Sequence, residues 1–146
     1  MVRDLISGTE MARFFRTVSL LLGNGISICE AIGLASEILS NEVLKDSFQK
    51  TRSEILAQGI SFSESLREKK PIPSFVSTMV SVGEESGKLD GSLREISEIY
   101  AKETEQTIQV MSSLMEPILI LGIGSIVGFI VMAMLLPIFE IGLTVR

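Results

Sequence analysis

The sequence lacks histidine altogether and has a single cysteine, Cys29. Without histidine the chain cannot form a Ser-His-Asp triad, a histidine-ligated zinc site or the usual proton shuttle at neutral pH. One thiol cannot form an internal disulfide bond, and Cys29 has no imidazole to activate it as a nucleophile. We therefore expect a protein that is not an enzyme, with no catalytic residues and no cofactor.

Tryptophan is also absent, and aromatic residues make up only 5% of a chain in which 46% of residues are hydrophobic. The apolar residues are therefore mainly aliphatic. The chain has 13 basic and 18 acidic residues, a net charge of −5, and its lysines and arginines form no polybasic patch. This balance gives no electrostatic support for nucleic-acid binding, and a partner with a basic surface would suit the chain better.

The C-terminal part contains a long stretch without charge, residues 117–139, which lies between Glu116 and Glu140. With a helical rise of about 1.5 Å per residue, it is long enough to cross a hydrocarbon core of about 30 Å. Its position excludes a signal peptide, and a buried core helix would need a larger domain to enclose it. We therefore predict a transmembrane helix, in which Gly124 and Gly128 form a G-x-x-x-G motif that favours membrane helix packing.

The residues before this stretch have helical periodicity and show no alternation long enough for a strand. Ser27-x-x-Glu30 and Ser61-x-x-Glu64 match the capping box, and Asn41 suits an N-cap. No internal repeat is apparent. The expected helices span residues 9–22, 27–39, 41–58, 61–70, 73–86 and 90–136.

These patterns predict an all-α fold: an antiparallel six-helix bundle, in two groups of three, whose last helix continues into the transmembrane helix. Pro71 is expected to end the fourth helix and Pro73 to lie in the first turn of the fifth. The core positions predicted for the third and fifth helices are Leu44, Phe48, Ile55, Leu56, Phe75, Met79 and Val82. The expected domains are a lead-in at 1–8, a cytoplasmic helical bundle at 9–116, the transmembrane helix at 117–139 and a short tail at 140–146.

The segment VGEESGKLDGSLREISEIY has three interpretations: a phosphate loop, a cation site or a helix–helix turn. A Walker A loop would need glycine in place of Val82, so this interpretation is excluded. Glu84, Glu85 and Asp90 offer oxygen ligands without the spacing of an EF-hand, which leaves cation binding as an alternative. Gly87 could end one helix in the left-handed conformation and Asp90 could cap the next, so we interpret the segment as a turn.

Three segments together carry a family resemblance. VGEESGKLDGSLREISEIYAKE and SLMEPILILGIGSIVGFIVMAMLLPIFEI resemble the end of the inner-membrane platform protein of type II secretion and type IV pilus assembly, the type II secretion F domain family. ARFFRTVSLLLGNGISICEAIGLASEI resembles the opening of the same domain. The positions that match the turn motif and the boundaries of the span in that family are Gly83, Glu84, Ser86, Gly87, Leu89, Glu116, Pro117 and Pro137.

The resemblance implies a non-enzymatic scaffold in the bacterial inner membrane, with its helical domain in the cytoplasm. Family members have two related cytoplasmic domains and three membrane helices, and this chain is similar to the second domain plus the last span, so we expect a fragment. The implied partners are a cytoplasmic assembly ATPase, pilin or pseudopilin subunits, other inner-membrane assembly proteins, membrane lipid and further copies in a homo-oligomer. The five turn residues become candidates for partner contact or for shaping the fold.

Two alternatives to the platform remain at this point. A tail-anchored helical adaptor or regulator, unrelated to secretion, fits every pattern except the resemblance. A membrane-bound hydrolase that uses carboxylates such as Glu84 and Glu85 is more distant, because the chain lacks histidine.

Overall fold

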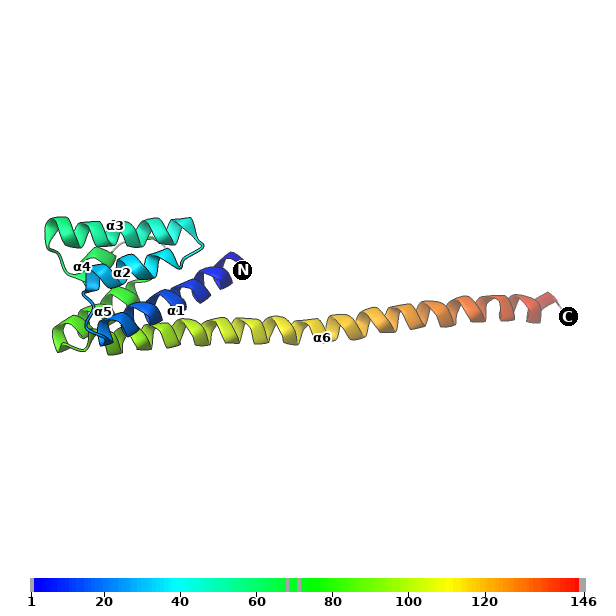
Figure 1. Ribbon diagram of the computed structural model, residues 1–146. Coiled ribbons are helices and arrows are strands. Elements are labelled where there is room, and N and C mark those ends of the chain that lie inside the picture. Colours follow the sequence, from blue (N-terminus) through cyan, green and yellow to red (C-terminus); the bar gives the residue numbers. More distant parts are fainter. Residues whose placement is uncertain (1, 68, 71, 145–146) are drawn as a thin grey trace. The chain divides into compact units, whose positions relative to one another are not determined.

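The computed structural model describes residues 2–67, 69–70 and 72–144, with side chains described between residues 7 and 137. Every regular element in these residues is a helix, which confirms the all-α class. The chain divides into two compact units, Met1–Glu105 and Gln106–Arg146, and α6 contributes residues to both. The helices are α1 (Val2–Gly23), α2 (Ile28–Glu37), α3 (Glu42–Gln58), α4 (Phe62–Leu66), α5 (Ser74–Ser86) and α6 (Leu89–Thr144) (Figure 1).

The predicted caps begin three of the helices. The Ser27 hydroxyl accepts a hydrogen bond from the Glu30 N–H at 3.4 Å, and the Ser61 hydroxyl accepts one from the Glu64 N–H at 3.1 Å. The Asn41 side chain accepts from two N–H groups in the first turn of α3. Each cap satisfies backbone donors that have no partner within the helix itself, so the local sequence is sufficient to place these three starts.

Other boundaries differ from the prediction. Helix α1 begins at Val2 rather than near Thr9, since the small Gly8 lets it continue past α6: a Cβ at Gly8 would lie 3.1 Å from the Thr104 hydroxyl. Pro73 is the N-cap of α5 and so precedes its first turn. Pro71, expected to end the fourth helix, lies outside the described residues.

Two connections share a short repeated motif that the sequence analysis missed. Residues 25–32 read GISICEAI and residues 59–66 read GISFSESL, with glycine, isoleucine, serine and glutamate at equivalent positions. Gly25 and Gly59 both have positive φ, 83° and 67°, a conformation that favours glycine. Each motif therefore ends one helix, reverses the chain through glycine and caps the next helix with serine.

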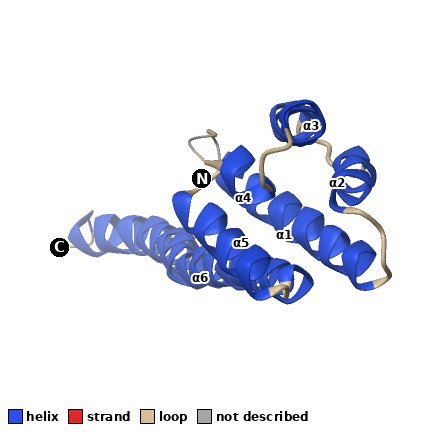
Figure 2. Cartoon of the chain, turned by 90° about the vertical axis from the view of Figure 1, so that its left-hand side faces the viewer, coloured by secondary structure: helices blue, strands red, loops and turns tan. Residues whose placement is uncertain are grey.

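Neighbouring helices of the first unit pack on one another in chain order, α1 on α2, α2 on α3, α3 on α4 and α4 on α5 (Figure 2). Their core contains a stacked pair of rings, Phe14 and Phe48, with centroids 3.7 Å apart, and Phe15 meets both rings edge-on. Burying one phenylalanine stabilises a fold by roughly 1.5–3 kcal/mol, so these rings are a main contribution to the unit. The first part of α6 adds Leu93, Ile96 and Tyr100 to the same core.

Two predicted core positions are wrong. Leu56 and Val82 are 63% and 58% exposed. Helix α5 instead buries Val76, Ser77, Val80 and Gly83, a stripe that includes two small residues. The prediction chose the larger apolar side chains on the adjacent stripe because it relied on hydropathy. Hydropathy does not show where two helices pack closely through glycine and serine.

Candidate functional site

The segment between α5 and α6 is a helix–helix turn, as predicted. Gly87 has φ 68°, its N–H donates to the Glu84 carbonyl at 3.4 Å, and the Lys88 N–H donates to the Gly83 carbonyl at 3.0 Å. These two bonds form a Schellman motif, which satisfies the last carbonyls of α5. Asp90 lies inside the first turn of α6, which begins at Leu89, so its predicted role as N-cap is wrong.

Gly83 lets α5 and α6 approach closely next to this turn. A Cβ at position 83 would lie 2.6 Å from the Ser92 hydroxyl oxygen, 2.8 Å from the Ser92 Cβ and 3.1 Å from the Leu89 Cα. Nearby, the Ser19 hydroxyl donates to the Asp90 carbonyl at 2.7 Å and joins α1 to α6. The turn is therefore held by three helices.

Glu84 caps the start of a different helix. Its two carboxylate oxygens accept hydrogen bonds from the Phe62 N–H at 2.7 Å and the Ser63 N–H at 3.2 Å. A carboxylate at the positive end of α4 satisfies two unpaired donors and is favoured by the helix dipole. In the part of the chain that the structure describes, no three acidic, cysteine or histidine side chains gather as a metal site.

The other two candidate residues of the turn, Ser86 and Leu89, differ in exposure. Ser86 is exposed, and its hydroxyl donates weakly to the Gly83 carbonyl at 3.4 Å. Leu89 is partly buried against the core. The fold thus gives Gly83, Glu84 and Gly87 structural roles, whereas partner contact by any of the five residues stays a prediction.

Glu10 plays the same role as Glu84 and was missed by the sequence analysis. Its carboxylate accepts from the Ser40 N–H at 3.0 Å and the Asn41 N–H at 3.1 Å, and the residue is only 7% exposed. The available signal was its position one helical turn before Phe14, on the buried face of α1.

Tyr100 carries an unsatisfied group in the core of the first unit. Its hydroxyl is buried and has no hydrogen-bond partner among the described residues. Burial raises the pKa of this hydroxyl, and the Glu103 carboxylate acts in the same direction. The ring lies near Phe15 and Phe75, with centroids 6.3 Å and 5.8 Å away.

An open groove of about 470 Å³ lies between α2 and α3 on the first unit. Residues of both helices line it, including Glu30, Gly33, Leu34, Glu37, Gln49 and Arg52.

Among the described helices, α6 is the one long and apolar enough to cross a membrane. Its most apolar window has a mean hydropathy of 2.7, and none of that window is buried. Pro117 and Pro137 lie inside α6. No atom lies within 4 Å of a Cβ built at Gly124 or Gly128, so both glycines are open to a neighbouring helix, and their role in helix packing stays a prediction.

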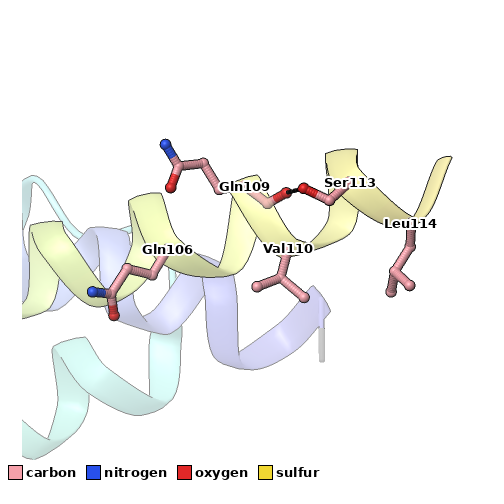
Figure 3. Close-up of a pocket in the computed structure, with 5 residues that line it drawn as sticks. All are labelled: Gln106, Gln109, Val110, Ser113 and Leu114. Atoms are coloured by element: carbon pink, nitrogen blue, oxygen red, sulfur yellow. Dashed lines mark hydrogen bonds between the residues drawn. The ribbon is translucent and has the colours of Figure 1, made fainter. Parts of the chain in front are cut away.

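The segment of α6 before the apolar stretch has a shallow hollow along one face (Figure 3). Gln106, Gln109, Val110, Ser113 and Leu114 line it, and the Ser113 hydroxyl donates to the Gln109 carbonyl at 2.9 Å. These side chains are uncharged, and the spacing i, i+3, i+4, i+7, i+8 places them on one side of the helix.

Comparisons with known proteins match most of the chain. The family model described as type II secretion system (T2SS), protein F, matches residues 14–137. The type IV pilus assembly protein PilC of Thermus thermophilus is 35% identical over 134 residues, which cover 91% of this chain and 33% of that protein. The type II secretion system protein F of Aeromonas hydrophila is 33% identical over 138 residues, or 92% of this chain and 34% of that protein. The chain thus spans about a third of the length of the curated relatives it matches.

Proposed function

The chain belongs to the type II secretion system protein F family, and from this premise we propose that it is a non-enzymatic platform component of a type II secretion or type IV pilus assembly machine. The family membership expected from the sequence is confirmed. The observation that carries the proposal is the extent of the match, because residues 14–137 include both the helical unit and the apolar part of α6. This match also counts against an adaptor unrelated to secretion.

In this proposal the apolar part of α6 crosses the bacterial inner membrane, and the first unit is an antiparallel six-helix bundle in the cytoplasm. The exposed apolar side chains of α6 support the first statement, since such a surface is stable in lipid and unfavourable in water. The cytoplasmic location of the first unit is supported by the family match and not by charge, because the basic residues near the span, Lys102 and Arg146, are balanced across it. The chain acts as part of a longer platform.

The platform couples a cytoplasmic assembly ATPase to pilin or pseudopilin subunits and forms a homo-oligomer. One feature that supports coupling is the continuity of α6, which runs from Leu89 to Thr144. Its beginning is fixed in the core of the first unit through Leu93, Ile96 and Tyr100. A force applied to the bundle therefore acts directly on the helix that enters the membrane.

Site-specific photo-cross-linking in host membranes tests the ATPase contact. A photoreactive residue at the exposed Ser86 should form an adduct with the assembly ATPase, whereas one at Thr78, exposed earlier on α5, serves as the matched control. If a bundle-wide scan in a working machine yields no adduct with the ATPase or with pilin-like subunits, the platform proposal is wrong.

A further inference from the structure

The groove between α2 and α3 is lined by one cationic side chain, Arg52 of α3. Arg52 lies against the backbone of α2 at Gly33, where a Cβ would be only 3.2–3.4 Å from its Nε, Cζ and Cδ atoms. Among the described residues Arg52 has neither an ion pair nor a hydrogen bond from its side chain. The missing side chain at Gly33 thus makes room for a guanidinium that stays free to bind a carboxylate.

The same groove contains an acidic side chain that, within the described part of the chain, is also without a partner. Glu30 lines the groove and has no side-chain partner in the described part of the chain. By contrast, the Glu37 carboxylate is already occupied, by the Lys45 ammonium at 3.1 Å and the Gln49 amide at 3.3 Å. Leu34, one helical turn after Glu30, is 51% exposed in the same groove.

The charged residues that line the groove have a net charge of −1, which becomes zero when Lys45, the ion-pair partner of Glu37, is included, although the chain has a net charge of −5. Glu30 and Glu37 are balanced by Lys45 and Arg52. Two copies of an acidic protein repel each other least where their facing surfaces carry no net charge. In the described part of the chain, one cation and one anion without partners, together with an exposed leucine, also meet the requirement of a two-fold contact, in which each copy supplies the cation of one pair and the anion of the other.

We propose that the α2–α3 groove is a contact between two copies of this chain. Arg52 of each copy binds Glu30 of the other across a two-fold axis, and the two Leu34 side chains are buried in the same contact. This inference rests on the homo-oligomer proposed above and assigns a surface to it. The paired charges set the register of the contact, while Leu34 contributes apolar burial.

Charge reversal in the full chain, reconstituted in lipid nanodiscs or micelles at low salt, tests this contact. Glu30→Arg and Arg52→Glu should each lower the self-association constant by about tenfold, because one reversal makes two pairs repulsive at a two-fold contact. An equimolar mixture of the two variants should associate nearly as well as the parent, since every cross-pair is then opposite in charge. Energy transfer between donor- and acceptor-tagged copies measures both effects.

Two matched controls separate this contact from folding effects. Glu64 occupies the position of Glu30 in the repeated motif, with the same serine cap, so Glu64→Arg controls for changes at a helix start. Lys50 lies two residues before Arg52, about 200° around α3, and pairs with Asp46 of its own helix, so Lys50→Glu controls for a charge reversal on α3 away from the groove. Both controls should leave association unchanged.

The outcomes distinguish the surface from the oligomer. If the parent chain is monomeric, both the homo-oligomer and this surface are wrong. If the parent associates and the single reversals have no effect, the oligomer stands and this surface is wrong. If the reversals weaken association but the mixture does not rescue it, the two side chains act within one copy and the proposed pairing is wrong.

Discussion

Gly83 offers the sharpest test of the packing around the α5–α6 turn. In Gly83→Ala the new Cβ would lie 2.6 Å and 2.8 Å from the Ser92 side chain and 3.1 Å from the Leu89 Cα. Rotation of the Ser92 side chain can move its hydroxyl oxygen away, but the Ser92 Cβ and the Leu89 Cα are fixed to the backbone of α6. The two helices must therefore move apart, which disturbs the Schellman motif and the hydrogen bond from Ser19 to Asp90.

The expected cost follows from two opposing effects. Overpacking in a close helix contact costs about 1–3 kcal/mol, whereas alanine gains about 1 kcal/mol over glycine in helix propensity. The net destabilisation should be about 0–2 kcal/mol, which for a domain of this size lowers Tm by up to about 10 °C. Gly91→Ala is the control, because a Cβ at Gly91 meets no atom within 4 Å, and this change should raise Tm slightly.

Tyr100 provides the assay. It is the only tyrosine in a chain without tryptophan, and it lies in the core of the first unit, so its near-ultraviolet circular dichroism follows that unit alone. The double variant Gly83→Ala/Ser92→Gly should recover part of the loss, since both close Ser92 atoms are removed. If Gly83→Ala raises Tm as Gly91→Ala does, the close approach of α5 and α6 is wrong.

Three further substitutions and one change of pH have defined outcomes. Glu84→Ala should cost about 1–2 kcal/mol, because two N–H groups at the start of α4 lose their acceptor; unchanged urea unfolding would contradict the cap. Tyr100→Phe should stabilise the unit or leave it unchanged, since the hydroxyl is buried without a partner; a loss above about 1 kcal/mol would reveal a bond that the structure lacks. Because the raised pKa of Tyr100 favours its neutral form in the folded state, the stability that Tyr100 contributes should be present below the ordinary tyrosine pKa of 10.0 and should fall as pH rises above it. A pH-independent Tm across this range would contradict it. Gly128→Asp should impair membrane insertion by about 2.5–3.5 kcal/mol, and normal integration in a carbonate-extraction assay would refute the assigned span.

The local features of the fold could be predicted from the sequence. Ser27, Asn41 and Ser61 begin helices because each acceptor lies within three residues of its donor. Gly87 ends α5 because few other residues adopt its positive φ. The apolar stretch of α6 was evident from composition alone.

The long-range features could not be predicted. The carboxylates of Glu84 and Glu10 reach helix starts that are more than twenty residues away, and nothing in the local pattern says which donor a carboxylate will meet. The buried stripe of α5 was misassigned because close packing selects Ser77 and Gly83 by size, which hydropathy does not measure. The repeated motif is hard to recognise in the sequence because it is short and half of its positions differ between the two copies.

The cap that Glu84 provides also bears on the order in which the chain acquires structure. Helix α4 has five residues, too few to persist alone in water. The Phe62 and Ser63 N–H groups donate to the Glu84 carboxylate, which reaches them only after α5 has packed against α4. The amides of α4 and α5 should therefore become protected from hydrogen exchange in a single cooperative event, so that the shortest helix reports on the assembly of its longer neighbour.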